Sequence, residues 1–583
     1  MSGEKTTNTP LESPAKALFL GRIVQQPVFP FPSIGSDERE TLQMVLESIN
    51  RFMESKSELY RSFDEEGFQS DEYVEELKSL GLFSLIVPAE FDGLGLSNSA
   101  YSRVLQETSR YDASTSLTIG AHSSIGMKAL LLFGSESQKA KYLPRLATGD
   151  LIAAFCLTEA GAGSDAASIK THATKNGDGS WTLNGEKIWI TNGGTAGFFT
   201  VFARTESDGG KITAFIVERE FPGVSSGPKE DKMGIRGSCT TTVRFDNVRV
   251  PAECVIGEEG KGFKVAMAVL NNGRTGLGGG CVGAMKQLIE LSLSQAAQRK
   301  QFGKSISEFQ LIQEKIAKMT TLCFASESIV SVVGHLVDSG SEDFSVEAAM
   351  SKVFISEALW TVADEALQIA GGNGFMREYP YERVVRDSRI NRIFEGTNEI
   401  LRLYVGLSGM KEAGDALRDV AKGLSGIFND PIKGFGVLTG YASRKIGQYT
   451  PIGRPNLTGV HSSLKEEARV FEQGIAFFSQ AVEGVLRRHG KGIIGQQLVT
   501  RRIADSAIEL FVGICVLSRV SSLIQERGEA KTEDERRIAR IFTHNAKVAV
   551  AAHLKAVYRN VDPDLCALAA SMSERGSFPW DVV

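Results

Sequence analysis

The spacing of apolar residues divides the chain into regions with different predicted secondary structure. From residue 36 to about residue 150, apolar side chains recur every three or four positions, which is the pattern of amphipathic helices. Between residues 151 and 257 the apolar period changes to two, which predicts short β-strands. After Gly262 the helical period returns and persists almost to the end of the chain. The pattern therefore predicts a mostly α-helical protein with a central β domain.

The predicted strands of the central region are short and are separated by turn sequences. They cover residues 181–183, 187–190, 198–202, 213–217 and 241–245. Asn-Gly-Asp-Gly at 176–179 and Asn-Gly at 184–185 are typical of the tight turns that close β-hairpins. Many short strands with frequent turns predict an antiparallel barrel or sandwich.

Long amphipathic helices are predicted on the C-terminal side of the strands. They cover residues 263–299, 309–338, 345–370, 380–390, 463–489, 496–527 and 532–559. The first 35 residues are rich in Pro, Ser and Thr and are expected to be extended, since Pro27, Pro30 and Pro32 exclude a helix around them.

Changes in composition and period predict the domain boundaries of this 583-residue chain. The expected segments are an extended arm (1–35), a helical domain (36–150), a β domain (151–257), a helical bundle (258–412), a glycine-rich basic connecting segment (413–462) and a helical extension (463–583).

Composition excludes several classes of function. A net charge of −5 over this length gives no indication of nucleic-acid binding. The seven cysteines show no paired spacing, which favours reduced thiols and no metal site. The chain has no secretory signal pattern and no run of about 18 apolar residues, so no membrane span is expected. A cytosolic protein and a processed mitochondrial matrix protein both fit.

The stretch around Glu395 carries the clearest candidate for catalysis. Glu395 lies between Phe394 and Gly396, directly before an apolar helical pattern that Thr397 is placed to cap and that has Glu399 in its first turn. A carboxylate between an aromatic ring and a tight turn loses water, which raises its pKa toward that of a general base. The residues alone also fit an ordinary helix start with a solvated glutamate.

Residues 392–400, Arg-Ile-Phe-Glu-Gly-Thr-Asn-Glu-Ile, closely resemble the catalytic segment of acyl-CoA dehydrogenases, in which the Glu of Glu-Gly-Thr is the base. The segment is most similar to the very-long-chain branch of that family and to its relative implicated in respiratory complex I assembly. The resemblance covers nearly the whole chain, including an extension that only long-chain members carry. It implies a helical N-terminal domain, an antiparallel β-barrel, a C-terminal helical bundle and an additional helical domain.

The loop at residues 156–165 is rich in glycine and hydroxyl groups. By itself it fits a plain turn, but it resembles the flavin-facing loop of the family, with Ala160 where the family usually has Pro. The resemblance implies that FAD is the cofactor, that Thr158 bonds the isoalloxazine, and that Ser164 bonds the flavin phosphate or the CoA chain. The other flavin contacts that it implies in this region are Cys156, Leu157 and Gly163.

Trp189, Ile190 and Thr191 end a predicted strand, where a core tryptophan at a hairpin end is the ordinary interpretation. They resemble the segment in which the tryptophan packs on the flavin and the threonine bonds near N5. Thr397 and Glu399 complete the cofactor contacts expected from the resemblance.

A second group of candidates lies around residues 299 and 370. Arg299 and Phe302 fit a solvated helix end, and Gln368, Gly371 and Gly372 fit a glycine helix stop. The glycines follow a helix rather than a strand, which excludes a Rossmann site. In acyl-CoA dehydrogenases the matching residues reach the flavin dinucleotide of a neighbouring subunit, so the resemblance implies at least a homodimer.

The resemblance also assigns substrate contacts. Asn271 and Arg274 match residues that steady the CoA adenine end, and Phe394 and Gly396 flank the base. The isovaleryl-type branch draws its base from the place that Gly273 occupies, which leaves Glu395 as the only base here. Ser116 and Gly120 would line the far end of the acyl tail, where medium-chain relatives carry larger polar residues. Small side chains there favour long acyl chains.

The implied activity is FAD-dependent oxidation of a long-chain acyl-CoA to a trans-2-enoyl-CoA in fatty-acid β-oxidation. Glu395 removes the α-proton, the β-hydrogen leaves as hydride to the flavin, and an electron-transfer flavoprotein accepts the electrons. Two alternatives stay open: an assembly or scaffold member of the family, and an acyl-CoA oxidase. Intact Glu395 and intact flavin loops favour the dehydrogenase.

The segment 431–460 is basic and partly apolar. It fits a mobile linker, a helix docked on the bundle, or a peripheral contact with an anionic membrane surface, which very-long-chain relatives make with the corresponding region. The expected location is the cytoplasm in a bacterium, or the matrix face of the inner mitochondrial membrane in a eukaryote.

Overall fold

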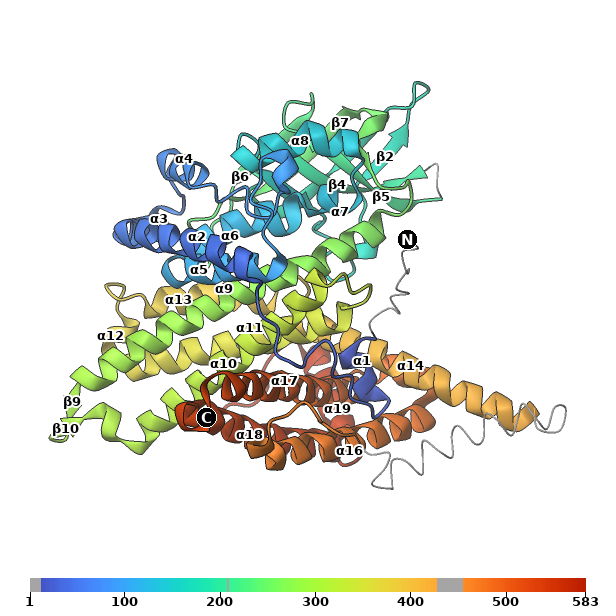
Figure 1. The fold of residues 1–583 in the computed structure, drawn as a ribbon. Coiled ribbons are helices and arrows are strands. Elements are labelled where there is room, and N and C mark those ends of the chain that lie inside the picture. Colours follow the sequence, from blue (N-terminus) through green and yellow to red (C-terminus); the bar gives the residue numbers. More distant parts are fainter. Residues whose placement is uncertain (1–11, 207–208, 427–454, 583) are drawn as a thin grey trace, which may run out of the picture. The chain divides into compact units, whose positions relative to one another are not determined.

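The computed structural model describes residues 12–206, 209–426 and 455–582 (Figure 1). The chain forms two compact units, one from residue 31 to residue 400 and the other from residues 12–30 with the chain after residue 400. Helices dominate both units, and a sheet lies in the middle of the first. The predicted fold class, mostly α with a central β domain, is therefore confirmed.

The first unit begins with a series of helices, four of which start at a polar residue that caps the helix. They are α2 (Ser36–Ser55), α3 (Leu59–Glu66), α4 (Asp71–Ser79), α5 (Asn98–Tyr111), α6 (Ala113–Gly120), α7 (Lys128–Phe133) and α8 (Glu136–Thr148). Ser70, Ser97, Asp112 and Ser135 each accept a hydrogen bond from a backbone N–H in the first turn of α4, α5, α6 and α8. α6 continues into a π-helical turn, Ala121–Gly126, which the apolar pattern did not predict.

The central sheet has eight strands. They are β1 (Ala153–Cys156), β2 (His172–Lys175), β3 (Trp181–Thr191), β4 (Phe198–Thr205), β5 (Lys211–Glu218), β6 (Val224–Lys229), β7 (Thr240–Val250) and β8 (Val255–Ile256). The order is β6-β7-β3-β2-β4-β5-β8, with β1 beside β4. Most neighbours are antiparallel, but β1 and β2 each pair in parallel with β4.

The two predicted hairpin turns had different outcomes. The turn at 176–179 joins the antiparallel strands β2 and β3, and the Asn176 amide donates to the Ser180 carbonyl over 2.7 Å. The hairpin at Asn184-Gly185 was wrong, because β3 is one strand of 11 residues paired with β7 on both sides of this point. Gly185 has φ +150° beside a register shift, so the glycine makes a β-bulge instead of a reversal.

The bundle of the first unit is built around one long helix, α9 (Gly262–Gln298), which packs on α5, α10 (Gln310–Asp338) and α11 (Ser345–Ala370) (Figure 1). α5 approaches α9 so closely that a Cβ at Gly279 would lie 2.2 Å from the Ser102 carbonyl oxygen. A Cβ at Gly283 would lie 1.9 Å from the Gln106 oxygen. Glycine is therefore required at these contacts.

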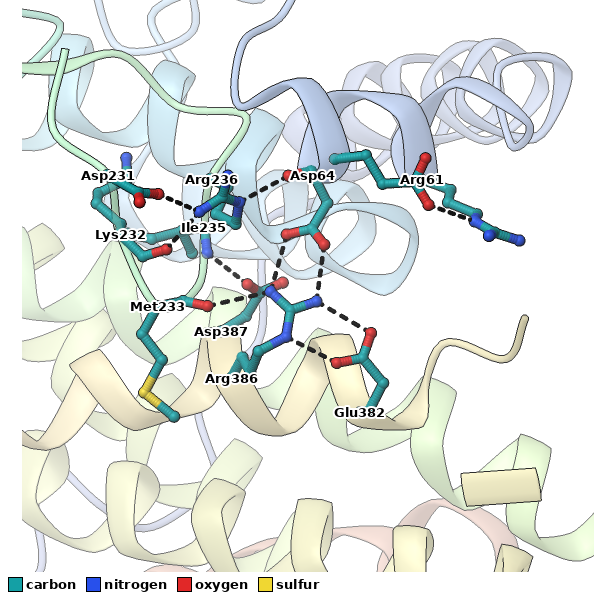
Figure 2. A network of polar contacts seen from close by, with 11 residues as sticks. Arg61, Asp64, Asp231, Lys232, Met233, Ile235, Arg236, Glu382, Arg386 and Asp387 are labelled. Atoms are coloured by element: carbon teal, nitrogen blue, oxygen red, sulfur yellow. Dashed lines mark hydrogen bonds and ion pairs between the residues drawn. The ribbon is translucent and has the colours of Figure 1, made fainter. Parts of the chain in front are cut away.

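A polar network ties α13 (Tyr381–Arg389) to α3 and to the connection between β6 and β7 (Figure 2). The Arg386 guanidinium donates to both carboxylate oxygens of Asp64, over 3.0 and 2.7 Å, and to both of Glu382, over 3.0 and 2.7 Å. It also donates to the Met233 carbonyl over 3.1 Å. The Arg386 side chain thus joins α13 to α3 and to the connection between β6 and β7.

The described part of the second unit consists mainly of helices. Its helices are α1 (Pro14–Phe19), α14 (Asn398–Gly426) from Leu401 onward, α16 (Lys465–His489), α17 (Gln497–Arg527), α18 (Glu533–Tyr558) and α19 (Asp562–Arg575). The prediction of an extended arm is wrong for the residues of α1. Ser13 caps this helix and Pro14 occupies its first turn, where proline is tolerated. The Phe19 ring packs edge-on against Phe478, with centroids 5.0 Å apart.

α10 and α17 are long and apolar enough to cross a bilayer by composition, but 61% and 78% of their apolar windows are buried within the protein. Such burial is typical of core helices. Residues 427–454 lie outside the described residues. Most of the basic segment 431–460 belongs to that range, so its peripheral membrane contact stays a prediction.

Replacing Arg386 by Gln is expected to lower the free energy of unfolding by about 1–3 kcal/mol, because Asp64 and Glu382 would face each other without a shared cation. Urea denaturation measures this. Arg61→Gln is the matched control: Arg61 makes an exposed pair with Glu65 (2.9 Å) on α3, and water and salt screen such a pair so that it contributes little to stability. Equal effects of the two substitutions would contradict the importance of the network.

Candidate active site

A cavity lies between α5, α6, the π-helical turn, α9, α13 and the segment that leads into α14. The space between these elements, with its open mouth included, is about 1040 Å³. Phe394, Glu395 and Thr191 line one part of it, and Ser116 and Gly120 line another. Residues predicted from separate stretches of sequence therefore meet in one place.

Glu395 occupies a left-handed turn, with φ +57°, and Gly396 follows with φ +93°. A left-handed glutamate is uncommon and costs free energy, so the surroundings must hold it. Arg274 on α9 donates to the Glu395 carbonyl over 3.3 and 3.4 Å, and Lys352 on α11 donates to the Gly396 carbonyl over 2.7 Å. Thr397 caps α14, since its hydroxyl accepts from the Ile400 amide over 3.3 Å, as predicted.

The Glu395 carboxylate is poorly solvated. Its Oε2 atom is buried and has no hydrogen-bond partner among the described residues. Burial raises the pKa of Glu395, and the cations Arg274 and Lys352 oppose that rise. The predicted desolvation is confirmed, and the alternative of an ordinary solvated glutamate does not fit.

Gly273 lies directly beside this carboxylate. A Cβ at Gly273 would lie 3.8 Å from Glu395 Oε2 and 2.9 Å from the Ile125 side chain. A residue with a carboxylate at this position could reach the same reacting atom as Glu395. Since glycine has no titratable group, Glu395 is the only candidate base of these two positions.

The loop after β1 is held in place by a buried ion pair. Lys187 on β3 is fully buried, and its ammonium donates to Glu159 over 2.8 Å and to the Leu157 carbonyl over 3.0 Å. The Ile188 amide donates to the Thr158 carbonyl over 3.0 Å, which fastens the loop to β3. Of the predicted loop residues, Cys156 and Leu157 are buried, Thr158 is half-buried, and Gly163 and Ser164 are exposed.

Trp189 is not a core residue. Its side chain is 64% exposed, and its φ of +56° turns it away from the strand, while Ile190 is buried and Thr191 lines the cavity. An exposed indole followed two residues later by a half-buried threonine that lines the cavity fits a flat, partly polar ring system such as isoalloxazine. These residues of β3 and the loop after β1 could therefore hold a flavin.

The second group of predicted flavin residues lies elsewhere. Arg299 follows the end of α9, about 39 Å along the helix axis from Gly273 at about 1.5 Å per residue. Phe302 is 94% exposed in the adjacent hairpin, and Gln368, Gly371 and Gly372 are also exposed. This axial distance separates Arg299 from the part of α9 that lies beside Glu395. The expected contact of this group with the flavin of a neighbouring subunit stays a prediction.

The predicted CoA residues lie close to the base. Arg274 is buried, and besides the Glu395 carbonyl it binds the Asn271 side chain over 2.6 Å. Its expected part in holding the adenine end of CoA stays a prediction. Glu399 is exposed at the start of α14, and its expected flavin contact also stays a prediction.

Sequence reasoning missed the polar residues that support the site. Lys352, Asn398, Lys187 and Glu159 are buried charged or polar residues within apolar surroundings. Each is a type that is rarely buried without a specific partner. The burial of such residues could have identified them as part of the site, but burial is known only from the structure.

Comparison with known protein families gives matches along most of the chain. Residues 39–150, 154–248 and 260–409 match the N-terminal, middle and C-terminal domains of acyl-CoA dehydrogenases, and residues 462–575 match the ACAD9/ACADV C-terminal domain. The very-long-chain-specific acyl-CoA dehydrogenase of Bos taurus mitochondria is 46% identical over 539 residues, covering 90% of this chain and 81% of the relative. The chain belongs to the acyl-CoA dehydrogenase family.

Solved structures agree with this. An acyl-CoA dehydrogenase from Bacillus anthracis, complexed with FAD, has a TM-score of 0.80 and 32% identity, covering 97% of this chain and 96% of its own. Butyryl-CoA dehydrogenase from Megasphaera elsdenii has a TM-score of 0.62 and 37% identity, covering 65% of this chain and 99% of its own. The predicted family, its FAD cofactor and its acyl-CoA dehydrogenase activity are thereby confirmed.

The raised pKa of Glu395 has a consequence for the pH dependence of this acyl-CoA dehydrogenase. A base acts only when ionised, so turnover should rise with pH through a midpoint above the usual range of an exposed glutamate. Glu395→Gln should lower turnover by about 10²–10⁴-fold at every pH, while exposed Glu90→Gln leaves the profile unchanged. A midpoint at the pH of a free carboxylate, or turnover of the Gln variant within tenfold of wild type, would refute the assignment.

Proposed function

We propose that this acyl-CoA dehydrogenase acts on long-chain fatty acyl-CoA in β-oxidation, with Glu395 as its base. The observation that carries the long-chain preference is a stripe of small residues along one face of α9. Gly273, Gly276, Gly280 and Ala284 recur every three or four positions and all line the cavity, which ends near Gln287. From Gly273 to Gln287 the helix axis advances about 21 Å.

That length decides between short and long substrates. An extended chain of single bonds advances roughly 1.2 Å per bond, so about 21 Å takes a chain on the order of 17 atoms. Ser116 and Gly120 face the middle of this channel and leave it open. The relative named above, specific for very long chains, is the type of enzyme that such a channel would serve.

The chemistry needs a base, a polar cradle for the thioester and a hydride acceptor. Bound FAD supplies the acceptor, and Thr158, Trp189 and Thr191 would hold its ring. Glu395 takes the α-proton of the acyl chain into its carboxylate. Charge then develops on the thioester oxygen, where the backbone amide of Glu395, held in its left-handed turn, is expected to donate a hydrogen bond. Phe394 and Gly396 flank the reacting carbons.

The enzymatic interpretation is favoured over a scaffold role by the unpartnered, desolvated carboxylate. A protein that only assembles others has no need to hold a glutamate in a left-handed turn with its Oε2 unsatisfied. An acyl-CoA oxidase would use the same base, and the acceptor distinguishes it.

Partners and location follow from the same proposal. An electron-transfer flavoprotein would accept the electrons, and a second copy of the chain would complete each flavin site. Several relatives are mitochondrial enzymes by name, which suits the matrix face of the inner membrane in a eukaryote and the cytoplasm in a bacterium.

Anaerobic bleaching of the bound flavin across saturated acyl-CoA lengths tests this function. Wild type is expected to bleach fastest with long chains, and Gly120→Glu should shift the optimum to shorter ones. The Cβ at this position meets only Leu105, at 3.6 Å, so the new carboxylate enters the channel and displaces methylenes worth about 0.8 kcal/mol each. Gly120→Ala is the control and should keep the wild-type profile. No bleaching with any length would overturn the function, and an unaltered optimum in Gly120→Glu would overturn the channel.

Arg299→Ala is expected to weaken retention of FAD and the association of subunits, because the guanidinium would bind pyrophosphate across the boundary between copies. Flavin absorbance per chain and light-scattering mass after gel filtration measure both. Lys300→Ala removes the adjacent exposed charge and should have little effect. Unchanged flavin content together with unchanged mass would count against the shared site.

A further inference from the structure

Lys352 is a buried lysine directly beneath the catalytic turn. It lies in α11 with no exposed surface, among apolar residues such as Val353 and Ile355. Its ammonium donates to the Gly396 carbonyl over 2.7 Å and to Asn398 Oδ1 over 2.8 Å. Burying an ammonium costs several kcal/mol unless it is well bonded, so a residue of this type at this position needs an explanation.

The contacts continue beyond Lys352 to both sides of Glu395. The Asn398 amide group donates to Ser356 Oγ and to Glu357 Oε1, both over 2.9 Å. The other Glu357 oxygen is paired with Arg392, over 2.9 Å. The polar chain therefore joins α11 to the residue that begins α14 and to the turn that precedes Glu395.

We propose that Lys352 is a positioning residue for the catalytic base: it holds the left-handed turn through the Gly396 carbonyl and Asn398, and it places a buried cation beneath the turn that carries Glu395. The inference rests on the proposed role of Glu395 as the base. It assigns to Lys352 a function in the proton-abstraction step, although Lys352 does not line the cavity.

The electrostatic surroundings support both parts. Arg274 and Cys281 face Lys352 from α9, Glu395 from the turn, and Glu357 from α11 itself. Burial and the neighbouring Arg274 lower the pKa of Lys352 to about 7, while the carboxylates favour its charged form. In the other direction, the Lys352 ammonium favours the carboxylate form of Glu395 and so lowers its pKa. A neutral side chain at position 352 would raise it.

A lysine that only supports the fold would also donate these hydrogen bonds. The experiment must therefore separate a structural role from an effect on proton abstraction by Glu395. The probe is a 3-thia acyl-CoA, in which sulfur replaces the β-carbon and no hydride can leave. Holoenzyme in D₂O exchanges the α-hydrogens of this probe only through the base, and mass spectrometry counts the deuterium. The rate is measured against pD.

Lys352→Met is expected to slow the exchange tenfold or more and to move its rising limb to higher pD by about 1 unit, since an opposite charge near the base has been removed. Lys128→Met is the matched control. Lys128 is a buried lysine of α7, with a pKa lowered to about 8 by burial. Its ammonium donates to Asn98 over 3.3 Å, on a different element from the turn that carries Glu395. Its exchange profile should coincide with that of wild type.

Two further variants divide the roles. Asn398→Ala removes the contact between Asn398 and Lys352 but keeps the charge of Lys352. It should therefore slow the exchange without changing the pD at which the exchange rate rises. Lys352→Arg keeps the charge, so its limb should stay near that of wild type. If Lys352→Met does not fold, these two variants decide: an Asn398→Ala rate equal to wild type would overturn the positioning role.

The outcomes also separate this inference from the proposed function. Absence of exchange in wild type would refute Glu395 as the base. Normal exchange in wild type together with a coincident profile in Lys352→Met would leave the base intact and overturn the role of Lys352.

Discussion

The site depends on how Glu395, the proposed base, is held. Its carboxylate must be shielded from water to have a raised pKa, and the surrounding structure must fix it in that position. Its backbone is left-handed, which glutamate adopts only when its surroundings fix it. Arg274 and Lys352 bind the two successive carbonyls of the turn from two different helices, so the turn is fixed through its backbone and the carboxylate stays unpartnered. The packing of α9 and α11 therefore decides whether the base exists at all.

The small residues of α9 allow close helix packing and, in the proposed function, also leave room for the acyl chain. On one side, Gly279 and Gly283 let α5 approach within contact of the helix backbone. On another, Gly273, Gly276 and Gly280 leave a channel that starts at Glu395. The same lack of side chains that brings the helices together keeps the channel open, so a larger residue on this helix would affect stability, acyl binding or both.

A buried lysine supports each of the two halves of the candidate site. Lys187 in the sheet and Lys352 in the bundle are both fully buried, and each binds a backbone carbonyl next to a functional residue, that of Leu157 before Thr158 and that of Gly396 after Glu395. Each also has a second polar partner, Glu159 or Asn398. A buried cation with two good acceptors is costly to disturb, which suits segments that must hold one geometry.

The sequence by itself determined the order of helix, sheet and helix, because periodicity is a local property of the side chains. It also identified Glu395 and its cap at Thr397, since turn and capping signals lie within a few residues. It misjudged Asn184-Gly185, because a bulge and a hairpin use the same residues and only pairing with β7 separates them. Tertiary structure alone decided what depends on distant contacts: the raised pKa of Glu395, the burial of Lys352 and Lys187, and the separation of Arg299 from the cavity. Burial and charge pairing are set here by contacts between residues 28 to 121 positions apart in the sequence, and no local pattern encodes them.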